Sequence, residues 1–168
     1  MTLTIESILV PALTRTLEAM SGYLKKGEAY ATEKAFDPSI LVNARLSPDM
    51  HPLKRQVQMT TDTARRMLCQ LGEMDVPSVA DTEETFEALQ QRLQSTLDFV
   101  NAFDRGTLKG AEERSITLPI GPNGLTLDAP SFLMGFGLPN LYFHAATTYN
   151  ILRQNGVPVG KMDFLGAP

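Results

Sequence analysis

The sequence is poor in the residues from which most catalytic and metal sites are built. It contains one cysteine, Cys69, and two histidines, His51 and His144. A single cysteine cannot form a disulfide within the chain, and this is typical of proteins in a reducing compartment. Cys69 lies among apolar residues of a helical pattern, which favours a buried structural thiol. We therefore expect a cytoplasmic protein.

Long apolar runs and basic clusters are also missing. No stretch approaches the roughly 18 consecutive apolar residues that a membrane-spanning helix needs. The first residues, MTLTIESILVPALTR, lack the basic leader and small-residue cleavage site of a signal peptide. The net charge is −4, with acids and bases interleaved. We therefore expect neither a membrane nor a nucleic acid as a partner.

The common catalytic motifs are absent as well. The chain has no glycine-rich phosphate loop, no Gly-x-Ser-x-Gly elbow and no Glu-x-x-His motif. No aspartate or glutamate occurs between Asp128 and Asp163, so the last helical segment offers no carboxylate ligand. A di-iron site of the ferritin type needs such ligands on all four helices of a bundle. The sequence therefore excludes that site.

Helical periodicity, in contrast, is strong in four segments. Apolar residues recur at spacings of three and four, which predicts helices over about 4–26, 48–71, 82–104 and 132–155. Gly27 follows the first segment as a C-terminal signal. Ser47-Pro48-Asp49 and the pair Asp81 and Glu84 are typical of helix N-termini. We expect an all-α fold, a four-helix bundle formed as a single domain by residues 1–168.

The connection between the third and fourth helices predicts a β-hairpin over about 115–128. Ile116 and Leu118 alternate with polar residues, the turn sequence GPNG follows, and Leu125 and Leu127 alternate again. Pro119 lacks a backbone N–H, which indicates an edge strand.

His144 is the most informative polar residue of the predicted fourth helix. It lies in LYFHAATTY, with Asn140 one turn before it and Thr148 one turn after it on the same face. Tyr149 lies nearby but off that line. Two interpretations remain open: a histidine that fills a gap in the core, or a metal ligand or acid–base group that faces a pocket.

Two segments carry a resemblance to a known family. NARLSPDMHPLKRQVQ and LPNLYFHAATTYNILRQNGVPVGKMDFLG are similar to a bacterial family known only as a domain of unknown function. That family resembles the DinB/YfiT-like superfamily of metalloenzymes, and the resemblance runs nearly from end to end. It implies a four-helix bundle of the DinB/YfiT-like type.

The resemblance also implies where a metal would bind. Members of the superfamily typically hold a divalent metal through one histidine on the second helix and a His-x-x-x-His pair on the fourth. His144 matches the first histidine of the pair, but Thr148 stands at the second position. Gln56 falls near the position of the remaining ligand, and His51 precedes it by five residues. We expect no cofactor, with zinc or nickel at His144 as the alternative.

Two functions follow from these residues. The first is a small-molecule-binding or interaction protein that kept the scaffold and lost the metal, with an unidentified small molecule as ligand and homodimers formed through apolar helix faces. The alternative is an enzyme, transferase or hydrolase-like, that uses either a divalent metal bound through His51 and His144 or His144 alone as a general base. In both, the site is expected to contain His144, His51, Gln56, Thr148, Tyr149 and Asn140. The sequence does not decide whether the protein is an enzyme.

Overall fold

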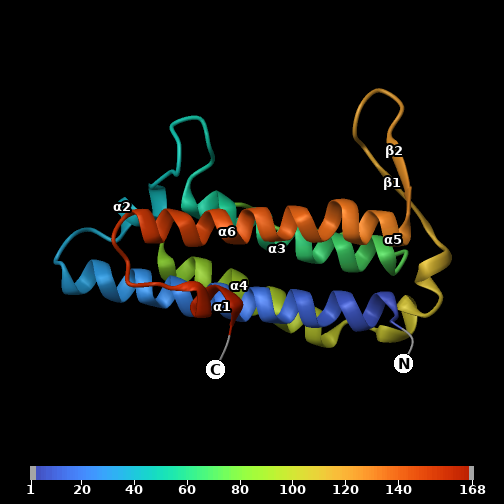
Figure 1. Ribbon diagram of the computed structural model, residues 1–168, viewed down its shortest axis with the longest axis horizontal. Helices are drawn as coiled ribbons and strands as arrows, with labels where there is room; N and C mark the ends of the chain where they lie inside the picture. The colour runs from blue at the N-terminus through green and yellow to red at the C-terminus, as the bar shows by residue number, and fades with distance from the viewer. Residues whose placement is uncertain (1–2, 167–168) are drawn as a thin grey trace.

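Four long helices lie side by side in the computed structural model, which describes residues 3–166 (Figure 1). They are α1 (Ile5–Glu33), α3 (Leu53–Leu71), α4 (Phe86–Ala102) and α6 (Leu138–Gln154). Helices α1 and α3 each pack against both α4 and α6, so that the four helices surround one apolar core. The predicted four-helix bundle is confirmed. Within residues 3–166, none of the helices combines the length and the apolar character needed to cross a membrane.

Short elements connect the long helices. A five-residue helix, α2 (Ser39–Asn43), follows α1, and two 3₁₀ turns, η1 (Arg105–Leu108) and η2 (Ala111–Glu113), follow α4. The last described helix, α7 (Lys161–Leu165), packs against α1.

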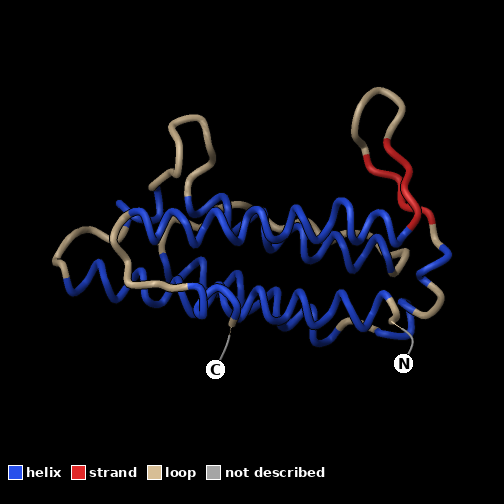
Figure 2. The backbone as a smooth tube through the Cα atoms, in the orientation of Figure 1, coloured by secondary structure: helices blue, strands red, loops and turns tan. Residues whose placement is uncertain are grey.

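The predicted β-hairpin is confirmed and projects from one end of the bundle (Figure 2). Strands β1 (Ser115–Leu118) and β2 (Leu125–Asp128) pair antiparallel, with Ser115 opposite Asp128. Its turn contains Gly121 and Gly124, both at positive φ, a conformation that glycine adopts without steric cost. Ile116 and Leu118 of β1 are buried, so this strand attaches the hairpin to the core.

Helix α1 is longer than predicted. It does not end at Gly27 but continues to Glu33, and Ala35 just beyond it has a positive φ of 55°. Gly27 is instead buried within the helix, where an added Cβ would lie 2.9 Å from Leu152 Cδ2. The prediction failed because a glycine can mark a close approach between helices as well as a helix end.

Helices α3 and α4 both begin later than predicted. Ser47-Pro48-Asp49 forms a turn, in which Met50 N–H donates to the Ser47 carbonyl over 3.0 Å, and α3 begins only at Leu53. Pro52 disfavours helical backbone at the residue before it, which explains the delay. Helix α4 begins at Phe86, where Thr85 caps Ala88 N–H over 3.1 Å. The acids at positions 81, 83 and 84 instead bind cations of α3 and α4.

The fourth helix is a composite. Asp128 caps its start by accepting from Ser131 N–H over 2.8 Å. Helix α5 (Ala129–Ser131) then leads through a π-helical turn, η3 (Phe132–Gly137), into α6. Pro139 near the start of α6 has no N–H for the preceding turn, and a widened turn accommodates such a residue. Gly156, at a φ of 88°, follows the end of α6.

The two glycines of α1 allow a test of its close packing. Gly22 has open space where a Cβ would lie, whereas Gly27 faces Leu152 and Phe86. We expect Gly22→Ala to stabilise the protein by up to about 1 kcal/mol through helix propensity. Gly27→Ala gains the same propensity but overpacks the core at a cost of about 1–3 kcal/mol, so it should be less stable than Gly22→Ala. Urea unfolding of the two variants measures the difference, and equal stability would contradict the close approach.

Candidate functional site

His144 lies in the middle of α6 and faces α3. Its side chain is buried, with 5% of the residue exposed. Its Nδ1 lies 2.8 Å from Oε1 of Gln56, which comes from the first turn of α3. The structure therefore brings together two of the residues expected at the site, across the α3–α6 interface.

The partners of Gln56 determine which nitrogen of His144 carries the proton. Gln56 Nε2 donates to the backbone carbonyl of His51 over 3.1 Å. A carbonyl oxygen only accepts, so the amide group must turn its NH₂ toward His51 and its Oε1 toward His144. Because Oε1 also only accepts, Nδ1 of His144 must be the donor. The neutral imidazole is thus held as the Nδ1–H tautomer.

The second ring nitrogen of His144 is left as an acceptor. Nε2 makes no hydrogen bond within residues 3–166, and it is not among the fully buried unpaired atoms, so it retains contact with solvent. Burial lowers the pKa of His144, and His51 and Arg55 lower it further by electrostatic repulsion. The side chain is therefore neutral near pH 7, with a lone pair available on Nε2.

His51 belongs to a loop beside this histidine. Leu53 N–H donates to the carbonyl of Ala44 over 2.9 Å and closes the loop at its base. Within the loop, Arg45 donates to the carbonyl of Met50. The side chain of His51 is exposed, while its carbonyl receives the amide of Gln56. This segment, which we term the Ala44–Leu53 loop, therefore reaches His144 through Gln56.

The remaining candidate residues have other partners. Thr148 is fully buried, and its hydroxyl donates to the carbonyl of His144 over 3.0 Å. Asn140 donates to Oγ1 of Thr63 on α3 over 3.0 Å. Asn140 therefore lies on the α3 side of α6, whereas the printed partner of Thr148 belongs to α6 itself.

Tyr149 takes part in different contacts. Its hydroxyl lies 3.5 Å from the carbonyl of Val159, and its ring meets those of Tyr23 and Phe164 edge to face. These partners belong to α1 and the C-terminal segment. The structure therefore places the contacts of Tyr149 on the side of α6 that faces α1 and α7.

The side chains around His144 do not match a metal site. Gln56 binds His144 through Oε1 and the carbonyl of His51 through Nε2, and the hydroxyl hydrogen of Thr148 is directed to a carbonyl. Within the part of the chain that the structure describes, no three His, Cys, Asp or Glu side chains come together as a ligand set. Structural and catalytic zinc sites use at least three such ligands. His144 Nε2 remains as a single imidazole donor.

A second polar cluster, absent from the sequence-based predictions, surrounds Arg92 on α4. Arg92 is 4% exposed, and it donates to Oγ1 of Thr61 over 2.7 Å and to Oδ1 of Asp62 over 2.6 Å. It also bonds to Glu83 over 3.0 Å, which ties the segment before α4 to the bundle. The signal available in the sequence was an arginine within the apolar stripe, between Leu89 and Leu93.

Comparisons with known proteins agree with this fold. The family described as Domain of unknown function (DUF1993) matches residues 6–165. The chain is similar to a DinB family member protein from Shewanella denitrificans, with 37% sequence identity and a TM-score of 0.88 over 95% of this chain and 90% of that chain. Among curated proteins, none matches the chain. The chain belongs to this family of unknown function and has the DinB-like fold, which confirms the resemblance.

The lowered pKa of His144 makes the stability of the protein depend on pH. As the pH falls below about 6.5, the ordinary pKa of a histidine, His144 binds a proton in the unfolded chain before it does so in the folded protein. We therefore expect the free energy of unfolding of the wild type to fall, relative to that of His144→Gln, as the pH drops below that value. Above it, the difference should stay constant.

Denaturant unfolding of both proteins between about pH 8 and about pH 5 measures this difference. Comparison with His144→Gln removes the contributions of all other groups, since these are common to both proteins. A wild type that gains stability relative to the variant on acidification would contradict a lowered pKa.

Proposed function

We propose that the protein binds a small polar molecule where α3, α6 and the Ala44–Leu53 loop meet, with Nε2 of His144 as the recognition group. The observation that carries the proposal is the hydrogen bond from Nδ1 to Gln56, which fixes the tautomer and directs the lone pair. A fixed acceptor whose lone pair keeps contact with solvent supports a binding role for this histidine.

The chemistry of Nε2 restricts the ligand. A neutral imidazole with its proton on Nδ1 has no proton to donate from Nε2, so it favours an O–H or N–H donor over a carboxylate. Phe143, 55% exposed, lies edge to face with the His144 ring at 5.3 Å between centroids and offers an apolar surface beside it. We therefore infer a ligand with a donor group attached to a flat or apolar part.

An enzyme that uses His144 as a general base is the alternative. Nε2 could accept a proton, but the imidazolium so formed would face the neutral amide of Gln56 and the nearby cation Arg55. Catalytic histidines of hydrolases usually have a carboxylate behind Nδ1 that stabilises this charge. The divalent-metal alternative needs further ligands beside His144. Binding is therefore the better supported function.

Nitrogen-detected NMR with a library of neutral fragments that bear O–H or N–H groups tests the proposal. The free protein should show the Nδ1–H tautomer, and bound fragments should shift the ring nitrogens of His144 and the amide of Gln56. His144→Gln should abolish these responses, whereas Tyr142→Phe, a change at an exposed residue of α6, should not. An Nε2–H tautomer in the free protein would refute the proposal.

Elemental analysis of protein purified without a histidine tag tests the metal alternative. We expect no zinc or nickel in stoichiometric amount, because the single imidazole lacks partner ligands. Metal at one equivalent in the wild type that is lost in His144→Ala would favour the metal-dependent enzyme. Metal that survives this substitution would lie elsewhere in the chain.

We also propose that the protein forms homodimers through apolar side chains of α6 and α7. Tyr142 of α6 and Leu165 of α7 are 42% and 44% exposed and line the same hollow. Exposed apolar surfaces are typical of protein interfaces. Light scattering should give twice the mass of the chain for the wild type, and Tyr142→Glu should give monomers. A monomeric wild type would contradict the proposal.

A further inference from the structure

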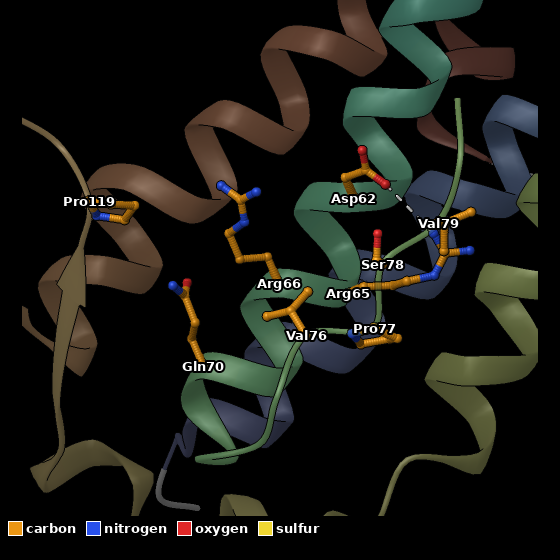
Figure 3. A pocket seen from close by; sticks show the side chains of 9 residues that line it. All are labelled: Asp62, Arg65, Arg66, Gln70, Val76, Pro77, Ser78, Val79 and Pro119. Atoms are coloured by element: carbon orange, nitrogen blue, oxygen red, sulfur yellow. Dashed lines mark ion pairs between the residues drawn. The ribbon is translucent and has the colours of Figure 1, made fainter. Parts of the chain in front are cut away.

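A hollow of about 410 Å³ lies on the outer side of α3, beneath the segment that leads to α4. Residues 76–79 of that segment form one wall, and Pro119 of the hairpin forms another (Figure 3). Its polar side chains come from α3 and from the covering segment: Asp62, Arg65, Arg66, Gln70 and Ser78. Its size lies within the range of small-molecule sites.

Arg65 lines this hollow as a buried cation with an incomplete set of partners. The residue is 4% exposed, and its guanidinium makes no hydrogen bond within residues 3–166. Its nearest carboxylate, Asp62, lies 3.7 Å away and is already bound by Arg92 over 2.6 Å. Burial and the charge of Arg92 both lower the pKa of Arg65. A buried charge without a close partner is costly, so a missing anion would relieve this cost.

A second group lies at the other side of the same hollow. Gln70 Oε1 is buried without a hydrogen-bond partner in the described chain. Arg66 is exposed and has no carboxylate within 4.0 Å among residues 3–166. Figure 3 shows Arg66 and Gln70 extending from α3 toward Pro119, whereas Arg65 extends the other way, toward Val79. The hollow thus offers a cation on each side and an acceptor beside one of them.

The balance of charge around the hollow favours an anion. Two arginines and one carboxylate line it, namely Arg65, Arg66 and Asp62. Asp62 is already bound by Arg92, which leaves Arg65 and Arg66 as the cations available for a ligand. Arginine binds carboxylates and phosphates through paired, charge-assisted hydrogen bonds.

We propose that this hollow is a binding site for a small organic anion with two anionic groups, carboxylate or phosphate, one bound by Arg65 and the other by Arg66, with a hydroxyl or amine donating to Gln70 Oε1. It is a second site, separate from that of His144, since the two use different faces of α3. The two sites also differ in chemistry, because His144 favours a neutral donor and the arginines bind an anion.

Thermal unfolding with added malate or inorganic phosphate tests this proposal, with sodium chloride at matched ionic strength as the reference. Malate provides two carboxylates and a hydroxyl, and inorganic phosphate provides a phosphate group. Comparison of the two therefore shows whether the site prefers a carboxylate or a phosphate ligand. We expect a saturable rise of Tm with at least one of them beyond the effect of chloride. No saturable rise with either anion would overturn the proposal.

Substitutions locate the site. Arg65→Met should weaken binding about tenfold or more, since it removes a charge-assisted hydrogen bond. Arg66→Gln, at an exposed position that the fold does not require, should also weaken it and remains informative if Arg65→Met does not fold. Arg153→Gln is the matched control at an exposed arginine of α6. Unchanged binding in Arg66→Gln and Arg65→Met would refute the site.

His144→Gln separates this proposal from the one at His144. Binding of malate or phosphate should persist in His144→Gln, because the arginines do not depend on that histidine. Loss of anion binding in His144→Gln together with retention in Arg66→Gln would overturn the assignment to this hollow.

Discussion

Close antiparallel packing of α3 against α6 is the constraint on which the rest of the structure depends. At one end, the packing is close because Gly137 has no side chain: a Cβ there would lie 2.6 Å from Cε of Met67. Further along, Asn140 bonds to Thr63, and His144 bonds to Gln56. Polar groups buried between two helices need partners, and here each helix provides them for the other. The contact both holds the bundle together and orients His144.

The same helix, α3, also carries the cationic cluster on another of its faces. Arg65 and Asp62 lie toward α4 and its preceding segment, where Arg92 takes most of the available carboxylate groups. One side of α3 is therefore a neutral hydrogen-bonded interface, and another is a positively charged one. A ligand suited to one side has the wrong chemistry for the other.

The relation to DinB-like proteins gives the His144 region its particular interest. In that superfamily a second histidine of the fourth helix completes the metal site, and Thr148 stands at that position here. Its hydroxyl is turned to the carbonyl of His144. Gln56 stands near the position of the third ligand. Its amide donates to the carbonyl of His51 and accepts from Nδ1 of His144. Gln56 and Thr148 thus both bond to His144, one to its ring and the other to its carbonyl.

Local sequence signals explain the successes and the failures of prediction. The periodicity of four amphipathic segments predicted the bundle, because an apolar stripe has to be buried whatever its neighbours are. Three signals misplaced helix ends: Gly27 marks a close contact, Ser47-Pro48-Asp49 forms a turn, and Asp81 binds cations of α3 and α4. Each of these residue types occurs both at helix ends and in other roles. Which role it takes depends on residues that are distant in the sequence.

By itself, the sequence determined the number and approximate positions of the helices, the hairpin and the place of His144 on the fourth helix. These depend on the spacing of residues along one segment. Only the tertiary structure decided the tautomer of His144 and the shortage of partners around Arg65. Both follow from contacts between residues far apart in the chain, such as Gln56 and His144, which are 88 positions apart. The direction of a hydrogen bond depends on which groups the partner's other atoms already bind. The spacing of residues along one helix does not reveal those groups.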